Sequence, residues 1–173
     1  MTTEPDNKSA VEQAWKIHAA QEGWTARVDT KATFSFTFCS AVIGIAVGLS
    51  AKDRLYSGLE NGTAVAFYWV GLIALMAGAV FAIITIIPRL KAADVKASAS
   101  DNFIYFGHAQ HWEADDLAEA LKKREILPVI TRQITVMADI AWQKHQWVQI
   151  SMWCGTSGGA MLVASGLIQS SMR

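Results

Sequence analysis

The sequence is poor in charged residues, and this shortage excludes several classes of protein. Only 17% of its 173 residues are Asp, Glu, Lys or Arg, whereas soluble proteins average about 25%. Hydrophobic residues make up 52% and the formal net charge is zero, so no overall positive field attracts nucleic acid. We therefore expect no nucleic-acid partner. The length predicts one domain over residues 1–173.

Motifs for catalysis and metal binding are also missing. The sequence has no HExxH, GxSxG, CxxC or phosphate-binding glycine loop, and each of these motifs places groups that a class of enzymes needs. The two cysteines, Cys39 and Cys154, lie in apolar stretches without metal-ligand spacing. Only His108 and His111 are close together among the four histidines, which favours surface histidines over a metal site. We expect a protein that is not an enzyme and holds no metal or cofactor.

What the sequence does contain is three long runs without Asp, Glu, Lys or Arg, which include residues 32–51, 64–88 and 147–171. A helix needs about 20 mainly apolar residues to cross the hydrocarbon core of a bilayer. The sequence therefore predicts an integral membrane protein with three transmembrane helices, at residues 32–51, 65–88 and 147–169.

The three runs differ in polarity. The third contains Gln149 and Gln169 together with several Ser and Thr residues, so it is the weakest of the three. The alternative is that these runs form buried helices of a soluble core. Such helices carry one polar stripe, and the stretch "FYWVGLIALMAGAVFAIITII" in the second run shows none.

The basic residues are unevenly distributed around these runs. Four precede residue 32 and eight lie in residues 89–146, while the remaining three are Lys52, Arg54 and Arg173. Basic residues concentrate on the cytoplasmic side of membrane proteins. We therefore predict a multi-pass protein with the N-terminus and residues 89–146 in the cytosol and the C-terminus outside.

The polar regions predict helices, so the expected fold class is all-α with a cytosolic helical bundle. Residues 8–31 form one predicted cytosolic helix, amphipathic over most of its length. Residues 126–150 carry an apolar stripe for a partner helix and run into the third span as one long helix, with Pro128 in its first turn. Between them, "EADDLAEALKKREI" predicts a short helix with acids first and bases last.

Small residues recur on one face of each span: Gly44 and Gly48, then Gly71, Ala74 and Gly78, then Ser151, Gly155 and Gly159. Such faces let helix backbones approach closely in lipid, either within one subunit or between subunits. A three-span subunit cannot enclose a pore and the 126–150 stripe needs a partner, so we predict a homo-oligomer. The partner helix can also be residues 8–28 of the same chain.

Asp29 and Lys31 stand directly before the first uncharged run. One interpretation makes them boundary markers, with Lys31 extending to the lipid headgroups and Asp29 in the aqueous layer. The other is an ion pair with another helix, such as one that carries Arg132 or Lys144. The residues alone leave both interpretations open.

Three stretches of the sequence resemble the Pycsar transmembrane effector (PycTM) family. They are Trp24 followed by "ARVDTKATFSF", then "DNFIYFGHAQHWEADDLAEAL", then "TRQITVMADIAWQKHQWV". The resemblance covers about residues 12–168, with the motifs in the family's order around the spans.

The resemblance implies an antiphage effector of the inner membrane. In that family a partner cyclase makes a cyclic pyrimidine mononucleotide, cCMP or cUMP, and the effector then impairs the membrane in abortive infection. The family signature also lies on Asp29 and Lys31, which favours a gating latch of these two residues at the cytosolic face. A small oligomeric channel or a scaffolding membrane protein without a nucleotide ligand is the alternative.

A cyclic mononucleotide offers one negative phosphate and one aromatic base, so its site needs a cation and a stacking surface. Arg132 and Lys144 are the candidates for the phosphate. Tyr105, Phe106 and Trp112 are candidates for stacking on the base, and Gly107 and His108 for close approach of the backbone. Each of these residues also has a purely structural interpretation.

Overall fold

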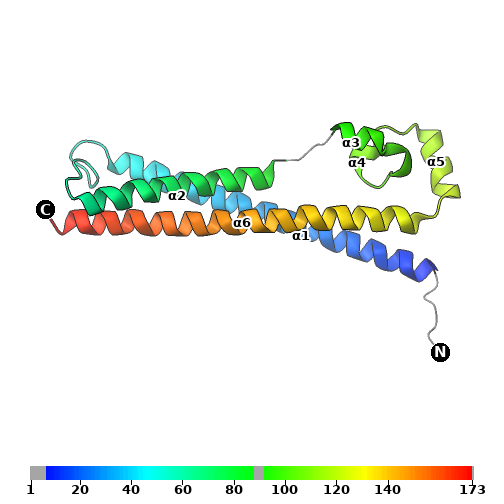
Figure 1. Ribbon diagram of the computed structural model, residues 1–173, viewed down its shortest axis with the longest axis horizontal. Coiled ribbons are helices and arrows are strands. Elements are labelled where there is room, and N and C mark those ends of the chain that lie inside the picture. Colours follow the sequence, from blue (N-terminus) through cyan, green and yellow to red (C-terminus); the bar gives the residue numbers. More distant parts are fainter. Residues whose placement is uncertain (1–6, 88–91, 173) are drawn as a thin grey trace, which may run out of the picture. The chain divides into compact units, whose positions relative to one another are not determined.

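The protein is described by a computed structural model, which covers residues 7–87 and 92–172 (Figure 1). Within these residues the fold is entirely helical, as the sequence predicts. The helices are α1 (Asn7–Leu49), α2 (Gly62–Ile86), α3 (Ala92–Ala97), the 3-10 helix η1 (Ala99–Asp101), α4 (Phe106–Ala109), α5 (Ala114–Lys123) and α6 (Ile126–Ser170).

The chain divides into two compact units. Unit 1 comprises Met1–Ala26 and Pro88–Trp142, and unit 2 comprises Arg27–Ile87 and Gln143–Arg173. Helices α1 and α6 each contribute residues to both units. The predicted cytosolic helix 8–31 and the predicted span 32–51 are parts of the single helix α1, which ends at Leu49. The long helix predicted from residue 126 onward is likewise continuous, as α6.

Unit 2 is a bundle in which α2 lies along the second half of α1 and of α6 (Figure 1). Glycines bring α2 and α6 together: a Cβ atom at position 158 would lie 2.7 Å from the Gly71 carbonyl oxygen. One at position 78 would lie 3.1 Å from the Cys39 sulfur of α1 and 3.2 Å from the Gly155 nitrogen of α6. The small-residue faces of α2 and α6 are therefore used within the subunit.

Hydroxyl groups hydrogen-bond across this bundle. Ser151 of α6 donates to the Gly78 carbonyl oxygen at 2.7 Å and shares a second hydrogen bond, also 2.7 Å, with Ser35 of α1. Ser165 of α6 donates to the Ala64 carbonyl oxygen at 2.8 Å. These side chains are buried, so each hydroxyl needs the protein partner that it has.

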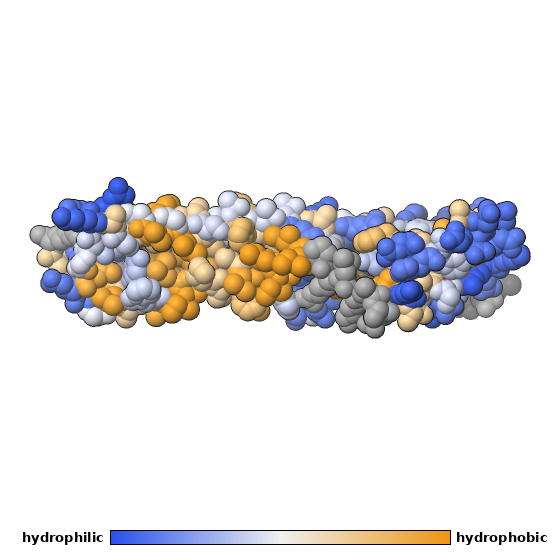
Figure 2. Space-filling view, turned by 90° about the horizontal axis from the view of Figure 1, so that it is seen from above, coloured by the Kyte–Doolittle hydropathy of each residue, from blue (hydrophilic) through white to orange (hydrophobic). Residues whose placement is uncertain are grey.

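The surface of unit 2 carries large apolar side chains (Figure 2). Phe34 of α1, Ile73 of α2 and Trp153 of α6 are 72%, 65% and 70% exposed. An exposed apolar surface of this extent marks contact with lipid or with another apolar partner.

Two of the described helices, α1 and α2, are long and apolar enough to cross a membrane, by length and composition. Residues 147–169 do not meet the same criterion, so the predicted third span was wrong. The Gln, Ser and Thr residues of this part of α6 lower its hydropathy. Three spans would put the N- and C-termini on opposite sides of the membrane, but two spans do not. The prediction that the C-terminus lies outside therefore loses its basis. Three residues on which these predictions drew lie outside the described residues. They are Pro88, at the predicted end of the second span, and Arg89 and Lys91, which contribute to the predicted excess of basic residues on the cytosolic side.

In unit 1 the short helices pack around Trp112. The indole nitrogen of Trp112 donates to the Ala99 and Asn102 carbonyl oxygens, at 2.8 and 3.0 Å. Phe103 meets the indole edge to face, with ring centroids 6.1 Å apart. Helix α5 is the predicted short helix. Its first turn holds Asp115 and Asp116 and its last turn Lys122 and Lys123, an order that complements the helix dipole.

Candidate functional site

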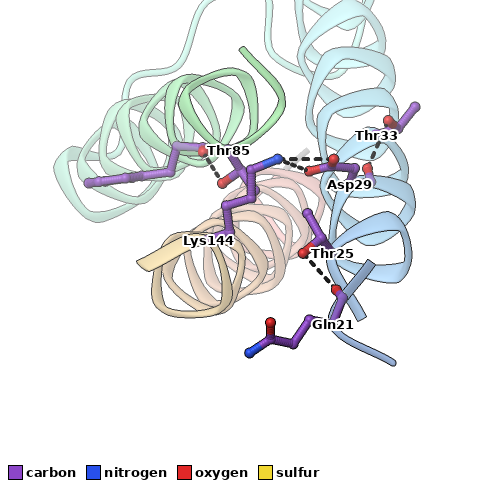
Figure 3. Close-up of polar contacts among 7 residues, drawn as sticks. Gln21, Thr25, Asp29, Thr33, Thr85 and Lys144 are labelled. Atoms are coloured by element: carbon purple, nitrogen blue, oxygen red, sulfur yellow. Dashed lines mark hydrogen bonds and ion pairs between the residues drawn. The ribbon is translucent and has the colours of Figure 1, made fainter. Parts of the chain in front are cut away.

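The predicted latch residue Asp29 forms an ion pair with Lys144 in unit 2 (Figure 3). The Lys144 ammonium nitrogen donates to both carboxylate oxygens of Asp29, at 2.7 and 3.0 Å. The Lys144 side chain is only 16% exposed and that of Asp29 is 38% exposed. The pair therefore joins α1 to α6 in a partly shielded place.

Apolar packing lies one turn away from this pair. Val28, Ala32 and Val148 form a small buried cluster on the same two helices. The cluster limits access of water to one side of the pair, and a shielded ion pair is stronger than one in open solvent. Lys31, by contrast, is exposed. The partner of Asp29 is thus Lys144, one of the two cations that the sequence offered for an ion pair with another helix.

Within unit 1, α1 and α6 also contact each other through polar groups. The Gln21 side-chain amide of α1 donates to the Ile134 carbonyl oxygen of α6 at 3.2 Å, while Thr25 donates to the Gln21 carbonyl oxygen within α1, at 2.9 Å. The residues of α1 that lie before Ala26 therefore supply a partner for the apolar stripe of α6 within the same chain. That stripe is no longer an argument for a second subunit.

Unit 1 contains an open pocket of about 670 Å³ formed by α3, η1, α5 and their connections. The indole of Trp112 borders it, together with charged side chains of both signs. The cations are Lys96, Lys123 and Arg124, and the carboxylates are Glu113, Asp116 and Glu119. Its volume is in the range of small-molecule sites, roughly 300–1,000 Å³.

Arg124 is the most firmly placed cation of this pocket. Its guanidinium carbon lies 5.4 Å from the centre of the Trp112 ring, within the range of a cation–π contact. One guanidinium nitrogen donates to the Ser100 carbonyl oxygen at 2.7 Å and lies 3.9 Å from an Asp101 carboxylate oxygen. Lys123 is paired with Glu119 one helical turn earlier. Arg124 thus presents a fixed positive group beside an aromatic face.

Among the predicted ligand residues 105–108, Tyr105 is the N-cap of α4 and the other three lie within this helix. Gly107 is buried, and a Cβ atom at that position would collide with the Tyr105 ring. Because Gly107 has no side chain, the Tyr105 ring fits beside it. This packing accounts for the glycine, and no ligand is needed to explain it. Phe106 is 70% exposed.

The His108 side chain contacts two other residues of unit 1, Ser98 and Tyr105. Its Nε2 atom lies 3.2 Å from the Ser98 hydroxyl, and its ring meets Tyr105 edge to face at 5.5 Å. Its Nδ1 atom is buried and has no hydrogen-bond partner among the described residues. Burial, and secondarily the neighbouring His111, lower the pKa of His108.

The structure does not bring the six predicted nucleotide-binding residues to the unit 1 pocket. Tyr105, Phe106, Gly107 and His108 are not among the residues that line it, Arg132 is exposed on α6, and Lys144 belongs to unit 2. Sequence reasoning considered Trp112 but missed Lys96 and Arg124. The run "KKR" at the end of α5 was a signal for Arg124, although helix-dipole pairing explained it equally well.

Comparison with known proteins gives one result. Residues 13–169 match the family model described as the Pycsar effector protein domain, which covers residues of both units and most of the chain. Searches among curated proteins and among solved structures gave no match.

Proposed function

This chain belongs to the Pycsar effector protein family, and from that premise we propose that it responds to a cyclic pyrimidine mononucleotide, cCMP or cUMP. In this proposal the response impairs the inner membrane and stops phage growth by abortive infection, without enzymatic catalysis. Family membership itself makes the protein an antiphage effector in a cyclic-nucleotide pathway with a cyclase. The family and the two apolar helices together indicate a membrane location.

The observation that carries the proposal is the extent of the family match, over residues 13–169. It includes the short helices of unit 1 and the helices of unit 2, so both belong to the effector. Unit 2, through α1 and α2, supplies the apolar helices that a membrane-impairing protein needs. Unit 1 supplies an open pocket for a small molecule.

We place the nucleotide in the unit 1 pocket. Its phosphate needs a fixed cation, and Arg124 is such a group because Trp112 and the Ser100 carbonyl orient it. The carboxylates of the pocket offer acceptors for the base amino or imide groups and for a ribose hydroxyl. The set Tyr105, Phe106, Gly107, His108, Arg132 and Lys144 stays as the competing prediction for the site.

Membrane impairment requires several copies in this proposal, because one small bundle encloses no pore. A Cβ atom at Gly44 of α1 would meet nothing within 4 Å, so this part of the first small-residue face is not used inside the subunit. A homo-oligomer is therefore part of the proposal. Asp29 and Lys144 link α1 to α6 in unit 2, which makes this pair our candidate for the gating contact.

Calorimetry on the detergent-solubilised full chain with cCMP, cUMP, cAMP and cGMP tests the proposal. We expect one of the pyrimidine nucleotides to bind, and we expect Arg124→Gln to weaken that binding about tenfold, the value of one charged hydrogen bond. Arg132→Gln is the matched control, because it removes an exposed arginine of the same unit that does not line the pocket.

Two outcomes would contradict this assignment. Loss of binding with Arg132→Gln but not with Arg124→Gln would move the site to the sequence-predicted residues. Absence of binding for all four nucleotides would overturn the ligand and leave a channel or scaffold without a nucleotide.

A further inference from the structure

One stripe of α6 is exposed throughout unit 2, although it follows the spacing of a helix-pairing seam. Its residues are alternately four and three positions apart, and all are exposed: Gln149, Trp153, Thr156, Ala160, Val163 and Leu167. We call this set the outer stripe. It is distinct from the buried face of α6 that carries Ser151 and Ser165. Spacings of three and four are typical of seams between parallel helices, so the outer stripe has the pattern of a second packing face.

The register between α6 and α2 gives the depth of the outer stripe within the bundle. Ser151 donates to the Gly78 carbonyl oxygen and Ser165 to the Ala64 carbonyl oxygen. The residue number thus rises along α6 as it falls along α2, so the two helices are antiparallel. Each step toward the end of α6 corresponds to an equal step toward the start of α2.

In this register Gln149 lies level with Val80 of α2, and Thr156 lies level with Ile73. Between residues 66 and 86 every exposed residue of α2 is apolar. From Val80 the apolar surface of α2 continues to Ile86, about 9 Å further at 1.5 Å per residue. Gln149 therefore lies well inside the apolar zone of unit 2, at a depth where α2 exposes only apolar side chains.

The polar groups of the outer stripe differ in how they are satisfied. The Thr156 hydroxyl donates to carbonyl oxygens of its own helix, those of Met152 and Trp153. The Gln149 amide is exposed and forms no hydrogen bond within residues 7–87 and 92–172. Hydrocarbon offers an amide no partner, and polar side chains at such depth normally face protein or water. Gln149 therefore calls for a partner of another kind than lipid.

We infer that the outer stripe is the contact between two copies of this chain, whose α6 helices lie parallel and side by side. The inference rests on the membrane location and the homo-oligomer of the proposed function. Copies inserted in one membrane in the same orientation are related by a twofold axis along its normal, which places each stripe residue opposite itself. An amide both donates and accepts, so the two Gln149 side chains satisfy each other.

This contact also explains how α6 can lie along α1 and α2. Only those two of the described helices are apolar enough to cross a membrane by length and composition. The buried face of α6 is satisfied by carbonyl oxygens of α2. With the outer stripe covered by a second copy, the remaining polar groups of α6 are also withdrawn from lipid.

Disulfide cross-linking in membranes tests the contact. Thr156→Cys and Ala160→Cys are introduced singly into a Cys154→Ala chain and oxidised with copper phenanthroline, without added nucleotide. We expect disulfide-linked dimers at both positions. Ile73→Cys is the matched control, because it is exposed at the same depth as Thr156 but on α2, and it should form few dimers.

The role of Gln149 is tested by the strength of the dimer. Gln149→Leu should raise the dimer dissociation constant about threefold, since interhelical hydrogen bonds in membranes are modest. Val80→Leu, an exposed change at the same depth on α2, should leave it unchanged. Native mass spectrometry at several protein concentrations in detergent measures the constant. An unchanged or tighter dimer in Gln149→Leu would overturn the pairing of the amides.

Three results would overturn the contact as a whole. Equal cross-linking of Ile73→Cys and Thr156→Cys would show random collision. Cross-linking of Gly44→Cys but of neither α6 variant would assign the contact to α1. An uncross-linked Thr156→Cys thiol that reacts with a membrane-impermeant reagent would show that the stripe faces water.

The nucleotide is tested separately by calorimetry on the same variants. Dimers without nucleotide binding leave the contact standing and overturn only the proposed ligand. Nucleotide binding by a chain that forms no cross-links at Thr156→Cys or Ala160→Cys overturns only the contact.

Discussion

The two units distribute polarity in opposite ways. Unit 2 buries hydroxyl groups, among them Ser35, Ser151 and Ser165, while it exposes large apolar side chains such as Ile73 and Trp153. Unit 1 buries Phe103 and much of Trp112 under short helices whose outer faces are charged. Around Trp112, unit 1 thus follows the pattern of a protein in water, whereas unit 2 inverts it.

The inversion teaches where the stability of each unit originates. In apolar surroundings burial of a leucine gains little, so a bundle depends on close backbone packing and on hydrogen bonds between helices. The glycine contacts of α2 with α6 and the serine hydrogen bonds to carbonyl oxygens provide both. Unit 1 depends instead on removing aromatic surface from water.

The largest effect should come from breaking the packing of unit 2. A leucine in place of Gly158 would force its side chain into the Gly71 carbonyl and Leu75, which a Cβ atom already approaches at 2.7 and 2.9 Å. We expect Gly158→Leu to destabilise the bundle by about 3 kcal/mol or more, measured as a lower thermal midpoint and loss of monodispersity in detergent. Gly62→Leu, at a position of unit 2 where a Cβ atom would meet nothing within 4 Å, is the control, and equal midpoints for the two variants would refute glycine packing as the basis of unit 2.

Removing a buried hydroxyl should have the next largest effect. Ser151→Ala deletes two hydrogen bonds, to the Gly78 carbonyl and to Ser35, so we expect a loss of about 1–2 kcal/mol. Ser157→Ala is the matched control, because its exposed hydroxyl bonds only to carbonyls of its own helix. Thermal unfolding in the same detergent compares the two variants. A change no larger than that of Ser157→Ala would show that the interhelical bonds do not matter.

The ion pair should have a smaller effect on stability and a clearer one on function. Lys144→Met leaves Asp29 without its bidentate partner and should destabilise unit 2 by about 1 kcal/mol. We expect altered killing after nucleotide induction with normal membrane insertion. The same change at exposed Lys31 should be silent in both assays. Killing that changes with Lys31→Met alone would support the latch as first predicted from the sequence, between Asp29 and Lys31.

The smallest effect concerns pH and sharpens the unit 1 side of the comparison. The pKa of His108 is lowered in the folded protein, so the unfolded chain binds the proton more readily. Stability from this group is therefore present above about pH 6.5 and lost as the pH falls below that value. Relative to the intrinsic exchange rate at each pH, the protection of the α3–α5 amides, followed by hydrogen exchange and mass spectrometry, should fall on acidification. His108→Gln should remove that dependence, and a persisting slope would assign it to another group.

Local patterns were sufficient to predict the long helices and α5, but not the short helices α3, η1 and α4. Charge order predicted α5, Pro128 marked the start of α6, and the uncharged runs predicted the apolar parts of α1 and α2. The third span was wrong because a count of charges does not register hydroxyl and amide groups. In α6 some of those groups, such as Ser151 and Ser165, face inward to carbonyls of α2, and only the fold shows this.

The contacts of the candidate site could be predicted from the sequence less well than the helices. Nothing local distinguishes Lys144 from Arg132 as the partner of Asp29, because the choice depends on how α1 and α6 pair over a separation of 115 residues. The pocket beside Trp112 likewise depends on the Ser100 carbonyl meeting Arg124, 24 residues later. A pattern of residue types predicts which groups are available, and long-range packing decides which of them meet.

The reach of the contacts in unit 2 has a consequence for biosynthesis. The long-range hydrogen bonds of Ser35, Tyr56 and Ser165, and the pair of Asp29 with Lys144, join residues 101 to 116 positions apart. Such non-local contacts form late, because the intervening chain must be closed into a loop first. Helices α1 and α2 are therefore synthesised with their glycine surfaces and carbonyl partners uncovered, and the bundle closes only once the ribosome has delivered α6.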